Sequence, residues 1–141
     1  MATFNKVNVF TENLAEKVHN LGADTLKVAL TNTAPTSAST VLADITQITA
    51  ANGYSSGGTA ATISTSAQSA GTYKLVLADV VFTASGGCIG PFRYAVLYND
   101  TPTSPADPII GYWDYGASVT LADGETFSVD FSADNGVLTL A

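Results

Sequence analysis

The sequence predicts a mainly β protein, a single-domain antiparallel β-sandwich of jelly-roll type with one amphipathic helix near the N-terminus. Two observations favour this fold class. Short apolar segments separated by turn residues follow one another from residue 60 onward, and only one segment, near the start, has a helical period. A chain of 141 residues fits one domain with a sizeable core, so we treat residues 1–141 as a single domain.

A helix is expected over residues 5–20, because apolar residues recur there at every third or fourth position. They are Phe4, Val7, Phe10, Leu14, Val18 and Leu21. Asn5 or Asn8 could begin the helix as an N-cap, and Gly22 stands where a left-handed residue often ends one. No other segment of the sequence has a helical pattern of useful length.

After Gly22 the period changes from helical to alternating. Residues 25–32 place Leu26, Val28 and Leu30 on one face of a strand. Residues 33–59 are mostly small and polar around a short apolar island, which predicts a long loop, or an arm that orders against a neighbouring molecule. The β-sandwich is then expected to comprise residues 25–32 and 60–141.

The strands expected after residue 60 are short and closely spaced. They cover residues 60–66, 72–83, 91–99, 109–115, 118–121, 126–131 and 137–140. The dipeptides Asp123-Gly124 and Asn135-Gly136 tolerate positive φ and are typical of hairpin turns. If both form hairpins, these share the strand 126–131 and give a C-terminal meander.

Charge and cysteine content argue against several classes of function. The formal net charge is −7 and the five Lys and Arg residues are scattered singly, so we expect no nucleic acid and no membrane as a partner. Only 12% of the residues are charged, so Ser and Thr must cover much of the surface, which suits close packing against other protein. One cysteine and no long apolar run predict a protein made in a cytoplasm, neither secreted nor inserted in a membrane.

Residues able to catalyse a reaction or bind a metal are scarce. The single histidine, His19, is expected to have a structural role near the end of the helix, and no serine-nucleophile motif accompanies it. Cys88 has no second sulfur or histidine beside it and is expected to be a small packed thiol. The acidic residues mostly stand alone, and their spacing does not match a calcium loop. We therefore expect no catalytic, cofactor-binding or metal-binding residues, and no enzymatic activity.

The aromatic residues Tyr112, Trp113 and Tyr115 are the best candidates for an interaction surface. Alternation along a strand puts Trp113 and Tyr115 on one face and Tyr112 on the other. If one of these faces is open, the rings could stack on a sugar or anchor a protein interface. The other interpretation is that Trp113 and Tyr115 belong to the core, since a domain of this size needs large apolar side chains inside.

Four runs of the sequence resemble small virion structural proteins of tailed bacteriophages and prophages. The runs are FNKVNVFTENLAEKVHNLGADTLKVALTNTAP, VLADITQITAANGYSSGG, YKLVLADVVFTASGGCIGPFRYAVLYND and YWDYGASVTLADGETFSVDFSADNGVLTLA. The most specific parts are residues 86–100 and 119–140. Neither part is a catalytic signature.

The resemblance implies a capsid decoration protein, also called a cement protein, which binds the outside of the expanded head and bridges neighbouring capsid subunits. The implied partners are the phage major capsid protein and further copies of this chain, as a homo-dimer or homo-trimer. The implied location is the capsid surface of the virion, after synthesis in the host bacterial cytoplasm. The alternative is a tail or tail-tip component that binds a host surface glycan, which would need a solvent-facing Trp113 or Tyr112. A hydrolase would instead need His19 or a pair of acids in a cleft.

Overall fold

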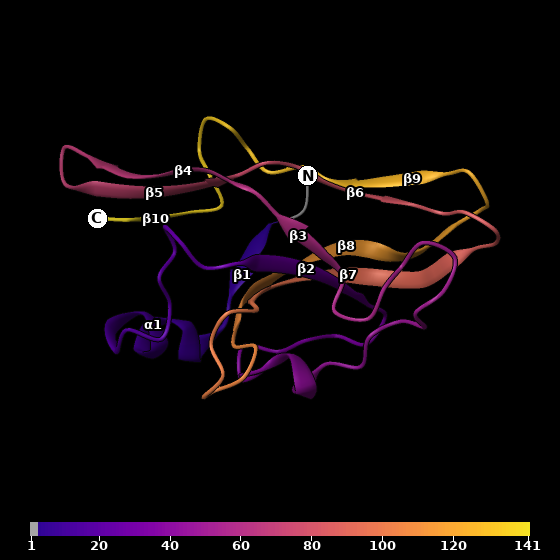
Figure 1. Cartoon of the computed structure of the whole chain (residues 1–141), viewed down its shortest axis with the longest axis horizontal. Coiled ribbons are helices and arrows are strands. Elements are labelled where there is room, and N and C mark those ends of the chain that lie inside the picture. Colours follow the sequence, from indigo (N-terminus) through magenta and orange to yellow (C-terminus); the bar gives the residue numbers. More distant parts are fainter. Residues whose placement is uncertain (1–2) are drawn as a thin grey trace.

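The computed structural model describes residues 3–141, and most of its regular structure is antiparallel strand (Figure 1). The helices and strands of this part of the chain are β1 (Phe4–Lys6), α1 (Asn8–Ala15), β2 (Leu26–Thr31), the 3-10 helix η1 (Leu42–Asp44), β3 (Thr59–Ala61), β4 (Ile63–Ser69), β5 (Thr72–Leu77), β6 (Val80–Thr83), β7 (Ile89–Asn99), β8 (Ile109–Leu121), β9 (Thr126–Val129) and β10 (Leu138–Leu140).

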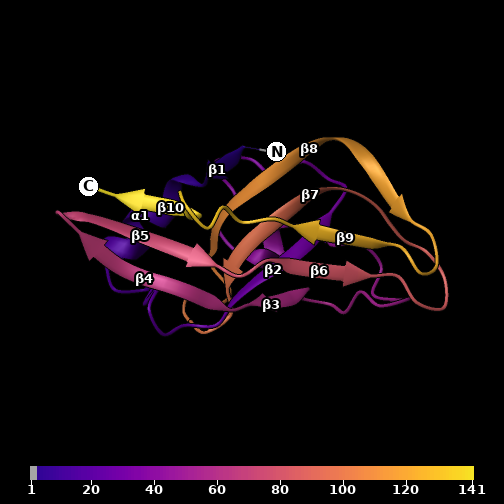
Figure 2. The ribbon, with the colours of Figure 1, turned by 90° about the horizontal axis from the view of Figure 1, so that it is seen from above.

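The strands form two packed layers. One layer is a five-stranded sheet in the order β1-β8-β7-β2-β3, and the other contains a three-stranded sheet, β10-β5-β4, and a two-stranded sheet, β6-β9. Figures 1 and 2 show the two smaller sheets end to end over the large one. All of these strand pairs are antiparallel. The predicted antiparallel β-sandwich is therefore confirmed.

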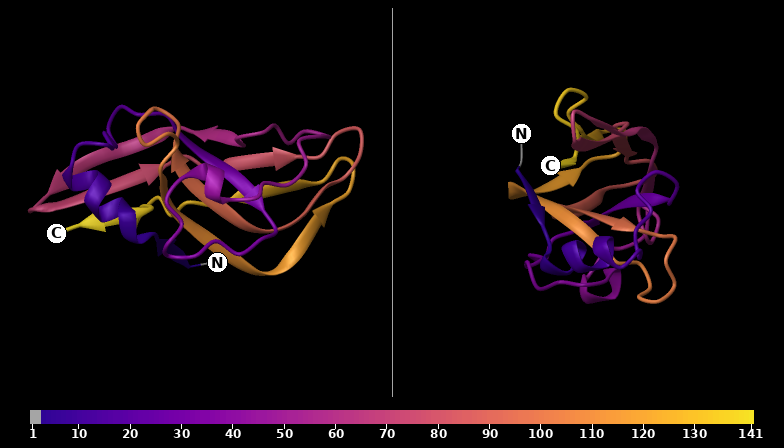
Figure 3. Two further views of the ribbon diagram at one scale, coloured as in Figure 1. Left: turned by 90° about the horizontal axis from the view of Figure 1, so that it is seen from below. Right: turned by 90° about the vertical axis from the view of Figure 1, so that its left-hand side faces the viewer.

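The large sheet is covered on both of its faces. In β2, Leu26, Val28 and Leu30 are fully buried between the layers, as alternation predicts, but Ala29 and Thr31 on the opposite face are buried as well. The helix α1 and the first half of the long segment after β2 lie against that opposite face (Figures 1 and 3). The core therefore extends to both sides of the sheet, which the alternation of one strand does not reveal.

The helix is shorter than the predicted range of residues 5–20, since α1 begins at Asn8 and ends at Ala15. The residues before it form β1, in which Phe4 stands opposite Trp113 of β8. Strand pairing replaces the first helical turn because it packs the Phe4 ring on the Trp113 ring, with 5.0 Å between the ring centroids. The helix ends before Lys17, whose φ of 68° is left-handed and cannot continue a right-handed helix.

Residues 33–59, predicted as a loop or an arm, lie folded on the body of the protein. An antiparallel bridge joins Gln47 to Thr31 at the end of β2. Tyr54 is only 3% exposed, and its hydroxyl accepts a hydrogen bond from the Leu30 N–H at 3.1 Å and donates one to Gln47 Oε1 at 2.8 Å. The segment therefore acts as a fixed cover of the large sheet in the isolated chain.

The two predicted turns form, but neither makes a hairpin. Gly124 and Gly136 adopt φ values of 88° and 75°, as expected for Asp-Gly and Asn-Gly turns. However, β9 pairs with β6 and β10 pairs with β5, so the predicted C-terminal meander is wrong. Phe127 of β9 packs on Phe92 and Tyr115 of the large sheet, at centroid distances of 4.9 and 5.0 Å. Burial of these rings between the layers explains why the chain crosses to the other layer after β8.

The predicted strands 60–66 and 72–83 are each divided between two sheets. The first becomes β3 and β4, and the second becomes β5 and β6. Asp79, in the short link between β5 and β6, accepts at Oδ1 a hydrogen bond from the Phe131 N–H at 2.9 Å. This contact ties the crossing between the two smaller sheets to the segment that follows β9.

Candidate functional site

An open groove lies between β8 of the large sheet and β9 of the two-stranded sheet. It has a volume of about 640 Å³, and we call it the β8–β9 groove. Its lining residues come from these two strands and the position after β9: Trp113, Asp114, Tyr115, Gly116, Ser128, Val129 and Asp130. Two of the three aromatic residues singled out in the sequence are among them, so this groove is the candidate functional site.

The groove owes its shape to a large bulge in β8. Tyr94 of β7 stands opposite Asp114 and Phe92 opposite Val119, so residues 115–118 face the single residue Arg93. The extra residues bend β8, as Figure 2 shows, and join the predicted strands 109–115 and 118–121 into one.

Gly116, at the tip of the bulge, has a φ of 85°, a conformation that side-chain-bearing residues rarely adopt.

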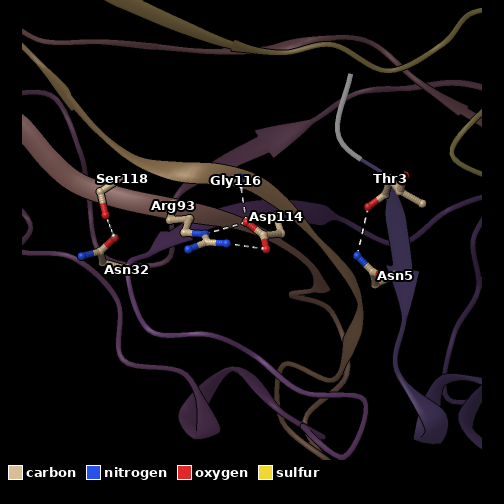
Figure 4. Close-up of polar contacts among 7 residues, drawn as sticks. All are labelled: Thr3, Asn5, Asn32, Arg93, Asp114, Gly116 and Ser118. Carbon is tan, nitrogen blue, oxygen red and sulfur yellow. Dashed lines mark hydrogen bonds and ion pairs between the residues drawn. The ribbon is translucent and has the colours of Figure 1, made fainter.

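Charged and polar contacts fix both ends of this bulge (Figure 4). The Asp114 carboxylate accepts hydrogen bonds from Arg93 Nε at 2.7 Å, from Arg93 Nη2 at 3.1 Å and from the Gly116 N–H at 2.8 Å. These bonds hold the pKa of the Asp114 carboxyl below its usual value. At the other end, Ser118 Oγ donates to Asn32 Oδ1 at 2.8 Å. The bulge is therefore a built feature of the fold.

The floor of the groove is aromatic and largely buried. Trp113 is 8% exposed and packs between Phe4 and Phe131, at centroid distances of 5.0 and 5.5 Å. The Tyr115 ring is half-buried and meets Phe127 edge-on. Burial, with the negative charge of Asp130 as a smaller cause, raises the pKa of Tyr115 to about 12. The core interpretation thus describes most of the Trp113 side chain, since too little of it is exposed for a sugar to stack on the ring.

Tyr112 lies apart from the other two aromatic residues. It stands opposite Asn5 of β1 and Val96 of β7, and as the neighbour of Trp113 in a regular stretch of strand it points to the other face of the large sheet. Its side chain is half-buried. The structure therefore brings Trp113 and Tyr115 together and separates Tyr112 from them, as alternation predicts.

Both walls of the groove are edges of sheets. Within residues 3–141, β9 pairs only with β6, and β1 pairs with β8 only from Gly111 to Trp113. Every second residue of an edge strand points its N–H and C=O groups away from its partner strand, so β9 offers hydrogen-bonding groups to an extended chain. On the β8 side, Trp113 already pairs with β1 and the Gly116 N–H is bonded to Asp114. The groove can thus accept another strand along β9.

Asp130 gives the groove a free negative charge. Its side chain is exposed and takes part in no hydrogen bond or ion pair with the other residues from Thr3 onward, whereas the charge of Asp114 is neutralised by Arg93. Sequence reasoning missed Asp130 and Ser128 as site residues because they come from the other layer. The one signal for the groove in the sequence was Gly116, which interrupts an otherwise alternating aromatic strand.

His19 is buried in the loop after α1, at 5% exposure, and not at the end of a longer helix. Asn99 Oδ1 accepts from the Thr101 N–H, so Asn99 Nδ2 donates to His19 Nδ1 at 3.1 Å and to Asp24 Oδ2 at 2.7 Å. The imidazole therefore carries its proton on Nε2, a buried atom with no hydrogen-bond partner among the described residues. Burial lowers the pKa of His19, and Asp24 opposes this in part.

The remaining candidates from the sequence are Cys88 and the acidic residues. Cys88 is exposed between β6 and β7, so the prediction of a packed thiol is wrong. The two glycines before it, Gly86 and Gly87, have positive φ and bend the chain at the surface. No three His, Cys, Asp or Glu side chains within residues 3–141 gather closely enough to hold a metal ion. In the same range, no helix is long and apolar enough to cross a membrane.

No protein-family model, no curated protein and no solved structure matches the chain.

Proposed function

We propose that the protein is a non-catalytic structural component of a phage virion: a capsid decoration protein that binds the outer head surface and bridges and stabilises neighbouring major capsid subunits. The observation that carries the proposal is the β8–β9 groove, which has the unpaired edge of β9 along one wall and an aromatic floor. The resemblance of the sequence to phage virion proteins supports the same function.

The groove fits an extended segment of the capsid protein better than a small substrate. A segment that enters it would hydrogen-bond to the edge of β9 and lie over Trp113 and Tyr115. The free carboxylate of Asp130 favours a segment that carries a Lys or Arg side chain at this point. Backbone pairing gives the contact its strength, and the charge and the aromatic floor give it selectivity.

The composition of the surface suits this role. With 12% charged residues, the chain loses little desolvation energy when its surface packs against other protein. Each contact can be modest, because a protein that binds only the assembled shell stabilises it by mass action, and many bridges act together.

The alternative of a glycan-binding tail component requires an aromatic ring with a free face. Trp113 is 8% exposed with Phe4 and Phe131 against it, which weighs against stacking of a sugar on this ring. The other ring named for this alternative, Tyr112, is half-buried on the opposite face of the sheet.

The proposal is tested by adding the purified protein to expanded phage heads that lack it. We expect the protein to sediment with the heads up to a saturating number of copies and to raise their melting temperature. The variant Asp130→Lys should bind about tenfold more weakly, because it reverses the one free charge of the groove. Glu12→Lys, the same charge change on an exposed position of α1, should bind like the wild type.

Two results would contradict the proposal. One is a wild-type protein that does not sediment with heads at all. The other is equal binding by the wild type and Asp130→Lys, which would remove the groove from the interface.

A further inference from the structure

The strand β4 is an unusually long free edge. It has seven residues, Ile63–Ser69, and pairs on one side with β5 only. The other strands that form the edge of a sheet within residues 3–141 have three or four residues: β1, β3, β6, β9 and β10. Figure 1 shows β4 and β5 extending together beyond the end of the large sheet. Among the strands of this part of the chain, β4 is thus the longest that lacks a partner along the whole of one side.

This edge lacks the features with which proteins usually protect exposed strands. Such features are Lys or other charged residues, proline, and bulges. Residues 59–73 contain neither a charged residue nor a proline. The one register shift lies at the start, between Ile63 and Thr65, and the strand is regular from there to Ser69. The unprotected part is therefore flat enough to pair with a second strand.

The side chains of β4 leave its free edge accessible. On the inner face, Ser66 Oγ shares a hydrogen bond of 2.6 Å with the Tyr73 hydroxyl and lies close to Gly22. On the outer face, Thr65 and Ala67 are exposed. The loop that contains Gly22 thus covers one face of the strand and leaves the pairing edge open.

The distribution of charge indicates what can pair there. All 12 acidic residues lie outside residues 45–78, so β3, β4 and β5 belong to a stretch without a single carboxylate. Two copies of a chain with a net charge of −7 repel each other over most of their surfaces. The β4 edge is the place where a second copy can approach at the least electrostatic cost.

We propose that two copies of the chain associate through antiparallel pairing of β4 with β4 of the second copy. Antiparallel pairing of identical strands is two-fold symmetric, so the same residues serve both copies. The result is one continuous sheet in which the two three-stranded sheets join edge to edge. Ser and Thr side chains then stand opposite each other across the axis, where their hydroxyls can hydrogen-bond.

The expected dimer is weak in solution. Pairing over seven residues buries less surface than the roughly 1,200–2,000 Å² of a stable protein complex. Its dissociation constant should therefore be micromolar or weaker, and many such contacts on one particle would reinforce each other. The proposal concerns the free protein and does not depend on binding to a capsid.

Sedimentation velocity of the full chain, from about 5 to about 500 μM, tests the pairing, because this range spans the dissociation constants of weak interfaces. We expect a reversible monomer–dimer equilibrium. The double variant Thr65→Lys/Ala67→Lys places like charges across the axis and should weaken the dimer by about tenfold or more. The matched control is Val81→Lys/Thr83→Lys, which adds the same charge to the two exposed side chains of β6 and should leave the equilibrium unchanged.

Amide hydrogen exchange of the wild type gives a second test that does not require a variant to fold. Amides of β4 should become more protected at the high concentration, and amides of β9 should not. The proposal is overturned if the protein stays monomeric over the whole range or forms a closed trimer. It is also overturned if the β6 variant, and not the β4 variant, abolishes association, or if protection rises elsewhere than in β4.

Discussion

Removing one hydroxyl group should loosen the cover that residues 33–59 place on the large sheet. The Tyr54 hydroxyl is the acceptor for the Leu30 N–H at 3.1 Å and the donor to Gln47 Oε1 at 2.8 Å. Leu30 is fully buried, so Tyr54→Phe leaves its N–H without a partner and without access to water. Gln47 Oε1 keeps its second hydrogen bond, from the Gly57 N–H at 2.8 Å. The cost therefore falls mainly on one buried donor.

An unsatisfied buried donor costs about 1–3 kcal/mol, and we expect Tyr54→Phe to lower the free energy of unfolding by that amount. With an m-value of roughly 2 kcal/mol per M for a chain of this size, the urea midpoint should fall by about 0.5–1.5 M. Tyr112→Phe is the matched control, because Tyr112 is half-buried and its hydroxyl has no hydrogen-bond partner within residues 3–141. It should change the free energy of unfolding by less than about 0.5 kcal/mol.

Urea unfolding followed by circular dichroism measures both variants, and amide exchange locates the effect. In the wild type the amides of Leu30 and Gly57 should exchange slowly, and in Tyr54→Phe both should exchange faster. The reasoning is refuted if the two Tyr→Phe variants are equally stable. It is also refuted if amides of residues 33–59 exchange rapidly in the wild type, as those of a free arm would.

Three further predictions concern single side chains. Burial lowers the pKa of His19 below its usual 6.5, so as the pH falls the unfolded chain binds this proton before the folded chain does. The free energy of unfolding should therefore have its full value above pH 6.5 and decrease as the pH drops below it. The urea midpoint of His19→Gln should lack this part of the pH dependence. Trp113→Ala should cost about 3–5 kcal/mol in urea unfolding, because it empties the space between two aromatic neighbours, and the fluorescence of this single tryptophan should be blue-shifted in the wild type; an emission maximum typical of water would contradict the burial. Cys88 should react with a thiol reagent in the folded protein at nearly the rate seen in urea, and protection of the thiol until unfolding would contradict its exposure.

The sequence located most strands but not their partners. Turn residues mark where a strand ends, and these signals are local, so segments such as 25–32 and 91–99 agree with β2 and β7 within two residues. Pairing is decided by contacts between distant residues. Phe127 packs on Phe92 and Tyr115 in the other layer, and this burial outweighs the local tendency of Asp123-Gly124 to form a hairpin.

The length of the helix was also decided by a contact between distant residues. Phe4 and Phe10 both fit a helical period, yet only Phe10 lies in α1. Phe4 lies in β1 because it packs on the Trp113 ring, a partner more than one hundred residues away along the chain. These apolar residues are packed against the protein as their spacing predicts, but the spacing did not decide whether the segment packs as a helix or as an edge strand.

The sequence predicted the aromatic residues of the candidate site but not the residues that face them from the other layer. Alternation correctly put Trp113 and Tyr115 on one face, since the direction of neighbouring side chains in a strand is a local property. Ser128 and Asp130 could not be placed beside them, because they belong to another sheet and meet the first pair only through the fold. The bulge at Gly116 that shapes the groove was visible only as a break between two predicted strands.

The most direct test of the proposed function is the number of copies per virion, measured by quantitative mass spectrometry against the major capsid protein of purified particles. A decoration protein that bridges capsid subunits should be present at a ratio near one to the major capsid protein, or at a simple fraction of it. A handful of copies per particle would contradict the account and indicate a tail component, and absence from the particles would overturn a virion role altogether.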